Sequence, residues 1–146
     1  MFRFRLQRVL HLRESQENQI KMDLAALRYK IRNVEEQITS AQSSILELYR
    51  SMLQSSTKGM TGIEIRQWLA YIDIANLNLK KLNEELRSLR EEEELLVDQY
   101  LTARRERKIL QNLRARRFKN YVFEQDRLNR LYLDEVALRK VTRSER

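Results

Sequence analysis

The fold of this 146-residue chain is decided by the stretch Ser55-Ser56-Thr57-Lys58-Gly59-Met60-Thr61-Gly62. It contains both glycines of the sequence, and the sequence has no proline. Gly59 can adopt the left-handed conformation that ends a helix. Thr61 followed by Glu64 fits a capping box, in which each side chain accepts a hydrogen bond from the other residue's backbone amide. The stretch therefore predicts one helix that ends near residue 55 and a second that begins near residue 61.

Before this stretch, apolar residues recur at alternating steps of four and three. The positions are Leu6, Leu10, Arg13, Glu17, Ile20, Leu24, Leu27, Ile31, Val34, Ile38, Ala41, Ile45, Leu48 and Met52. Only Arg13 and Glu17 among them are polar. A mean step of 3.5 residues over more than six heptads indicates a coiled-coil seam and not the stripe of a globular helix.

After the stretch, a second seam runs from Ile65 to Leu138 in one register. It is apolar up to Ala103, with Glu93 the only polar member. It turns largely polar over 107–124, and leucines then resume it. Two long helices joined by a short loop fold back on each other. We therefore predict an all-α fold: an antiparallel coiled-coil hairpin whose second helix is longer than the first.

The expected hairpin is a single coiled-coil domain over 1–146, with helix one at about 3–55, a loop at about 56–61 and helix two at about 62–142. A turn centred near residues 59–60 places residue i opposite roughly residue 119 − i. At 1.5 Å per residue the second helix then extends past the first by roughly 25 residues. The predicted extension contains Phe118, Tyr121, Val122, Phe123, Leu128, Leu131, Tyr132, Leu133, Val136 and Leu138. An apolar helix surface without an internal partner predicts an external one.

The net charge of +8 comes entirely from the C-terminal third. Residues 1–103 carry 15 basic and 15 acidic side chains, whereas residues 104–146 carry 14 basic and 6 acidic ones. Such a basic segment attracts nucleic acid, an anionic membrane surface or an acidic protein surface. Nucleic acid is not expected, because the basic helix of a zipper protein leads directly into a parallel dimer, and here a hairpin intervenes.

Catalytic chemistry is not expected either. The chain has no cysteine and one histidine, His11, so thiol nucleophiles and His-based metal clusters are absent from the sequence. A two-helix hairpin offers no pocket for a general base. There is no Gly-rich phosphate loop. We expect no enzyme, no cofactor and no metal, and neither a secretory signal nor a membrane span. The seam leaves the oligomeric state open between one, two and four chains.

Four stretches carry a resemblance to a known family. They are the opening Phe2-Arg3-Phe4-Arg5-Leu6-Gln7-Arg8-Val9-Leu10 with Leu12-Arg13-Glu14, then Gly62-Ile63 with Trp68 and Tyr71, then residues 103–113, and finally Asp134-Glu135. In order, spacing and total length these stretches resemble the flagellar export protein FliJ family, a component of the flagellar type III export apparatus. The resemblance spans nearly the whole chain.

The resemblance implies a non-enzymatic, stalk-like coiled coil. Its expected partners are the hexameric flagellar export ATPase, the cytoplasmic domain of the export gate and the export chaperones. It implies a cytoplasmic protein, peripheral to the inner face of the cell membrane at the flagellar base. An alternative is a generic coiled-coil export chaperone or adaptor that binds substrates along its side.

Two sets of contact residues follow. By resemblance, contact with the ATPase ring falls to Arg104, Arg105, Arg107, Lys108, Leu110 and Leu113, and the physical argument adds Arg114, Arg117 and Tyr121. Tyr71 and Trp68 are candidates for contact with the gate or chaperones. Because Trp68 lies on the seam, packing is the role that its position favours. Tyr71 lies beside the seam and is freer to meet a partner.

Overall fold

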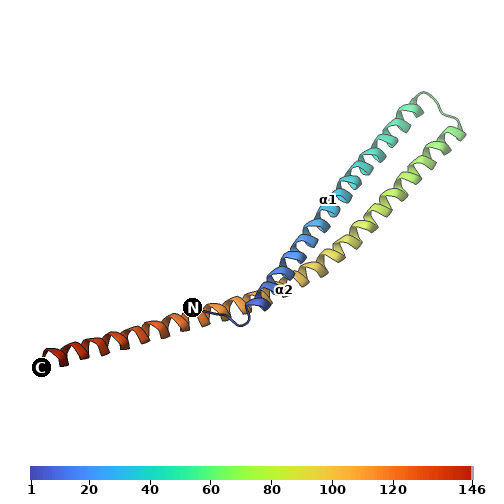
Figure 1. Ribbon diagram of the computed structural model, residues 1–146. Helices are drawn as coiled ribbons and strands as arrows, with labels where there is room; N and C mark the ends of the chain where they lie inside the picture. Colours follow the sequence, from blue (N-terminus) through green and yellow to red (C-terminus); the bar gives the residue numbers. More distant parts are fainter. Residues whose placement is uncertain (146) are drawn as a thin grey trace. The chain divides into compact units, whose positions relative to one another are not determined.

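The computed structural model describes residues 1–145, which form two helices packed against each other as a hairpin (Figure 1). Helix α1 spans Gln7–Thr57 and helix α2 spans Gly62–Ser144. The predicted all-α hairpin with a longer second helix is confirmed. The chain divides into two compact units, Gln19–Tyr100 and Met1–Asn18 with Leu101–Arg146. We describe each unit by itself.

The loop between the helices has the predicted chemistry. Gly59 takes a φ of 85°, in the left-handed region, and its amide donates to the carbonyl oxygen of Ser56 at 3.2 Å. The amide of Glu64 donates to the Thr61 hydroxyl oxygen, and the amide of Thr61 donates to the Glu64 carboxylate, both at 3.3 Å. The capping box is therefore present. It satisfies two backbone donors that would otherwise lack partners at the start of α2.

In the unit Gln19–Tyr100, α1 supplies most of the buried core. The buried side chains are Leu24, Leu27, Ile31, Val34, Ile38 and Ile45 from α1 and Ile72 from α2. All of them lie on the predicted seams. Most other seam residues of α2 in this unit are half-buried, because one facing helix cannot enclose a helix completely. An ion pair between Glu35 and Arg90 joins the two helices beside this core.

In the unit formed by Met1–Asn18 and Leu101–Arg146, the core is small. Leu10 is its most buried side chain, with 1% of its surface exposed, and Ala103 is also buried. Glu17 is the one buried charged residue among those described. Past the N-terminal segment, α2 continues as a single helix to Ser144 (Figure 1). This unit contains the candidate site.

Candidate protein-binding surface

The N-terminal segment before α1 is held on α2 by aromatic packing. The Phe2 ring meets the Phe118 ring edge-on, with centroids 5.3 Å apart, and meets the Tyr121 ring at 5.6 Å. Edge-to-face aromatic pairs at such distances contribute roughly 0.5–1.5 kcal/mol beyond the apolar area that they bury. Tyr121 is the last residue of α2 for which the structure gives a contact with the N-terminal segment. The residues of α2 beyond it, 122–144, are called the overhang below.

The two polar positions of the first seam form a polar layer between the helices. Arg13 Nη1 donates to Glu106 Oε2 at 2.7 Å, and Arg107 donates to the buried carboxylate of Glu17. Arg107 also donates to Gln111 Oε1 at 2.6 Å. Every buried side-chain nitrogen and oxygen of residues 1–145 has a hydrogen-bond partner. A charge inside a seam is tolerated only when it is paired in this way.

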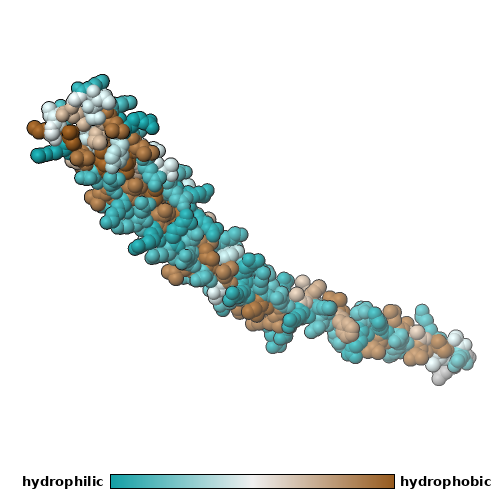
Figure 2. Space-filling model, turned by 180° about the vertical axis from the view of Figure 1, so that it is seen from behind, coloured by the Kyte–Doolittle hydropathy of each residue, from teal (hydrophilic) through white to brown (hydrophobic). Residues whose placement is uncertain are grey.

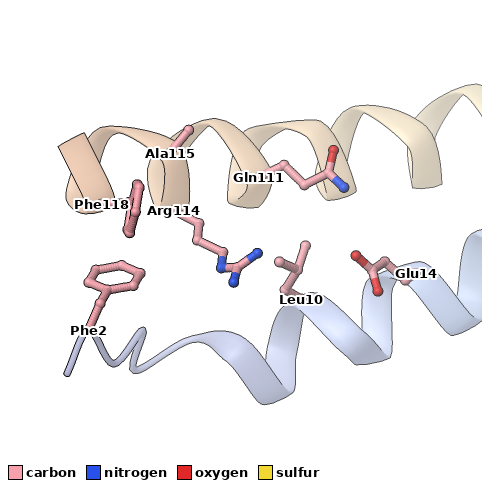
Figure 3. A pocket seen from close by; sticks show the side chains of 7 residues that line it. All are labelled: Phe2, Leu10, Glu14, Gln111, Arg114, Ala115 and Phe118. Atoms are coloured by element: carbon pink, nitrogen blue, oxygen red, sulfur yellow. The ribbon is translucent and has the colours of Figure 1, made fainter.

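A pocket of about 430 Å³ opens beside the aromatic contact. In Figure 3, Phe118 points toward Phe2, and Arg114 extends from α2 into the space between the helices, toward Leu10. Glu14, Gln111 and Ala115 complete the lining. The pocket is a gap in the seam where the long side chain of Arg114 takes the place of an apolar seam residue.

Between residues 104 and 119, five cations lie on the outer face of α2. At 100° per residue, Arg104, Arg105, Lys108, Arg116 and Lys119 fall within about 120° of the helix circumference, and all five are exposed. We call them the basic stripe. None forms an ion pair within the described part of the chain. Their charge is therefore available to an acidic partner.

The predicted ring-contact residues divide into two groups. The exposed ones are Arg104, Arg105, Lys108, Arg114 and Arg117, whereas Arg107, Leu110, Leu113 and Tyr121 are half-buried in the hairpin. Arg107 forms an ion pair with Glu17, and the Tyr121 ring contacts the Phe2 ring. Arg116 and Lys119 belong to the exposed group but were absent from the predicted set. Their spacing from Lys108 and Arg105 on the outer face is the signal that could have identified them.

The overhang exposes apolar side chains along its length (Figure 2). Between 47% and 71% of the surface is exposed in each of these apolar residues: Val122, Phe123, Leu128, Leu131, Tyr132, Leu133, Leu138 and Val141. Leu131, Tyr132 and Leu133 are consecutive, so their side chains leave the helix in three directions about 100° apart. The apolar surface of the overhang therefore surrounds the helix instead of forming one stripe.

Charged residues of the overhang pair with each other along the helix. Arg130 donates to Asp126 at 2.9 Å and Arg139 to Glu135 at 2.6 Å. Arg127 donates to Glu124 at 2.6 Å, and this hydrogen bond lowers the pKa of Glu124 below its ordinary 4.5. The pKa of Arg127 is raised by the same bond. Six of the nine charged residues of 122–144 therefore pair with each other, and Asp134, Lys140 and Arg143 form no ion pair within the described residues.

The two candidates for a second contact surface lie in the other unit. Tyr71 exposes 63% of its surface, whereas Trp68 is half-buried on the seam.

Neither helix of residues 1–145 contains an apolar run that could span a membrane. No three His, Asp or Glu side chains of residues 1–145 gather in a way that could hold a metal ion.

Comparison with known proteins identifies a family. Residues 1–146, the whole chain, match the family model described as "Flagellar FliJ protein". No curated protein and no solved structure matches the chain.

Proposed function

Because the chain belongs to the flagellar FliJ protein family, and so is a component of the flagellar export apparatus, we propose that it acts as the stalk of the hexameric export ATPase. In this proposal the basic stripe and the overhang enter the ATPase ring and promote its assembly and activity. The protein itself carries out no chemistry. It links the ring to the export gate and to substrate chaperones.

The observation that carries the proposal is the apolar surface around the overhang. Leu131, Tyr132 and Leu133 expose 54%, 66% and 63% of their surfaces in three different directions. A membrane surface or a single partner helix can cover only one side of a helix. A ring pore covers all sides at once, so it is the partner geometry that this surface fits best.

The basic stripe supports the same partner class. Five unpaired cations beside an apolar segment fit a pore whose entrance is acidic and whose interior is apolar. Electrostatic attraction of this kind mainly raises the rate of association and weakens as salt screens it. We expect the association rate with the ATPase to fall steeply with salt, while the dissociation rate depends chiefly on the overhang.

ATP turnover by the export ATPase tests the ring contact. The double substitution Leu131→Glu with Leu133→Glu changes two exposed residues that have no contact within the hairpin, so the hairpin should stay folded. We expect it to reduce stimulation of turnover at least about tenfold, because each buried glutamate must lose its hydration. The matched control is Leu46→Glu, which changes a residue with 66% of its surface exposed on α1. Equal stimulation by both variants would refute this placement.

The basic stripe is tested separately. Replacing Arg105 and Lys108 with glutamine should slow association with the ATPase and flatten its salt dependence. Replacing Lys80 and Lys81, which are exposed outside the stripe, should leave both unchanged. If the two sets slow association equally, the effect reflects net charge and the stripe has no specific role.

We propose Tyr71 as a contact for the gate or a chaperone, and a packing role for Trp68. The exposed ring of Tyr71 supports the first, and the half-buried seam position of Trp68 supports the second. Tyr71→Ala should weaken binding to the purified gate domain or to a chaperone without lowering the free energy of unfolding. Trp68→Ala should lower that free energy. The opposite pattern would exchange the two roles.

The alternative adaptor reading predicts that export substrates bind along the side of the hairpin. Under it, substrate binding would survive removal of residues 122–146, and ATPase stimulation would be absent in the full chain. We do not expect the protein to bind nucleic acid. DNA binding that weakens steeply as the salt concentration rises would contradict this expectation.

A further inference from the structure

The outer face of α2 near the loop carries a second apolar stripe at coiled-coil spacing. The residues are Ile63, Gln67, Ala70, Ile74 and Leu77, which again follow steps of four and three. All five are exposed, and they lie on the side of α2 away from the buried Ile72. Ile63, Ile74 and Leu77 expose 70%, 66% and 54% of their surfaces. We call this set the outer stripe.

The segment around the outer stripe is poor in charge. The charged residues between 37 and 79 are Glu47, Arg50, Lys58, Glu64, Arg66 and Asp73, in a chain that is 34% charged. The stripe also has defined ends. The loop precedes Ile63, and the next position after Leu77 in the same spacing is Lys81. Depletion of charge around exposed apolar residues is the compositional mark of an interface core. In Figure 2, apolar side chains reach the surface at this loop end.

We propose that the outer stripe binds the same stripe of a second copy of this chain, with the two α2 helices antiparallel. The stripe is self-complementary about Ala70. An antiparallel copy places Ala70 against its own counterpart, Ile63 against Leu77, and Gln67 within one residue step of Ile74. Alanine at the centre allows the two helices to approach closely. This is an isologous interface, in which one patch on each copy serves both partners.

Charges beside the stripe select this partner and this orientation. Arg66 and Asp73 are seven residues apart, so they lie on the same flank of the stripe. In an antiparallel pair, Arg66 of one copy meets Asp73 of the other, and the reverse contact forms by symmetry. Within the described residues neither side chain has an ion pair, so both are available. A parallel pair would instead place Arg66 near Tyr71 and gain no ion pair.

The interface is short, and its affinity should reflect this. Five layers over fourteen residue steps extend for about 21 Å at 1.5 Å per residue. That is less than a stable, obligate dimer uses, and Gln67 contributes no apolar surface. We therefore expect a reversible dimer with a dissociation constant in the micromolar range, of the kind that small interfaces support.

Sedimentation equilibrium of the full chain tests the proposal. The wild-type chain should shift from monomer to dimer as concentration rises. Ile74→Glu should weaken dimerisation at least about tenfold, since it places a charge in an apolar layer. The control Asn76→Glu adds the same charge to the same helix off the outer stripe and should have little effect. Far-UV circular dichroism checks that both variants remain helical.

Cysteine substitutions test the orientation, because the natural chain has no cysteine. Ala70→Cys should form an intermolecular disulfide under mild oxidation. Ile63→Cys alone should not, because its counterpart lies at the far end of an antiparallel stripe. A mixture of Ile63→Cys and Leu77→Cys chains should cross-link. Cross-linking of Ile63→Cys with itself would indicate a parallel pair and overturn the proposed arrangement.

Charge reversal tests the flanking ion pairs. Arg66→Asp and Asp73→Arg should each weaken the dimer several-fold at low salt, because like charges then face each other. The double variant should recover the wild-type affinity. A wild-type chain that stays monomeric up to millimolar concentration would overturn the proposal and leave the outer stripe to a different protein. A dimer unaffected by Ile74→Glu would place the interface elsewhere.

Discussion

Replacing Glu17 with methionine should destabilise the hairpin more than any exposed charge substitution. The carboxylate of Glu17 lies on the seam and accepts a hydrogen bond from Arg107. Methionine has similar length but no acceptor, so Arg107 keeps only Gln111 as a partner. The substitution therefore leaves a charge between the helices without its counter-ion.

The expected magnitude follows from the exposure of the pair. Breaking a fully buried ion pair from one side costs roughly 3–5 kcal/mol. The side chains of Glu17 and Arg107 are 11% and 21% exposed, so water partly solvates the remaining guanidinium. We expect a loss of about 2 kcal/mol in the free energy of unfolding. Glu35→Met breaks a pair whose side chains are 41% and 53% exposed and should cost less than about 1 kcal/mol.

Urea denaturation followed by far-UV circular dichroism measures both losses. The double variant Glu17→Met with Arg107→Met should recover most of the lost free energy, because an apolar layer replaces the charged one. The double-mutant cycle then gives a favourable coupling free energy between Glu17 and Arg107. Equal losses for Glu17→Met and Glu35→Met, or strictly additive effects in the cycle, would refute the reasoning.

Three further predictions follow from the seam, the loop and the overhang. Ile31→Ala, at a residue with 4% of its surface exposed, should lower the free energy of unfolding by about 2–3 kcal/mol in urea melts. Gly59→Ala should lower the free energy of unfolding by about 1–2 kcal/mol in the same assay, because alanine is strained at a φ of 85° even though no other atom lies near its added carbon. The control Gly62→Ala, at the start of α2, should leave that free energy unchanged or raise it. The hydrogen bond from Arg127 to the Glu124 carboxylate should stabilise the helix fully above pH 4.5, and this stabilisation should be lost as the pH falls through the lowered pKa of Glu124. In the Arg127→Gln variant, a carbon-13 NMR titration should show the pKa of Glu124 rising toward 4.5.

The sequence predicts the helices and their facing surfaces well, because these depend on local chemistry. Gly59, Thr61 and Glu64 determine the loop through short-range contacts, and the structure confirms their roles. The seam of α1 is also confirmed, since Leu24 to Ile45 bury the heptad positions that the pattern selects. Heptad spacing alone contains this information, because only one face of each helix can meet its neighbour.

The pairing between the helices was predicted correctly at one polar contact and displaced at the next. The turn midpoint places Arg13 opposite residue 106, and Arg13 does pair with Glu106. It places Glu17 opposite residue 102, whereas the Glu17 carboxylate meets Arg107. Long side chains reach about one turn along the partner helix, and a repeating seam does not distinguish registers that differ by a few residues. The midpoint also places Phe2 opposite residue 117, but the expectation that Phe118 and Tyr121 lack a partner within the chain was wrong, because both contact Phe2. This contact was not predicted. It depends on a non-helical segment, whose path no periodicity describes.

The ring-contact residues stay a prediction, and the structure gives only their exposure. Arg104, Arg105 and Lys108 are exposed where the basic segment placed them, but Arg107 is occupied by Glu17. A count of charges along a segment does not say which side chains face the hairpin. Sorting the same residues by helix face separates the basic stripe from the seam.

ATP turnover by the flagellar export ATPase, titrated with this protein, tests the central claim most directly. Stimulation should saturate at about one copy per six ATPase subunits, because a ring has a single axis. The chain lacking 122–146 should give little stimulation while remaining helical. Saturation at about one copy per subunit, or full stimulation by the truncated chain, would contradict the claim that the overhang enters the ring.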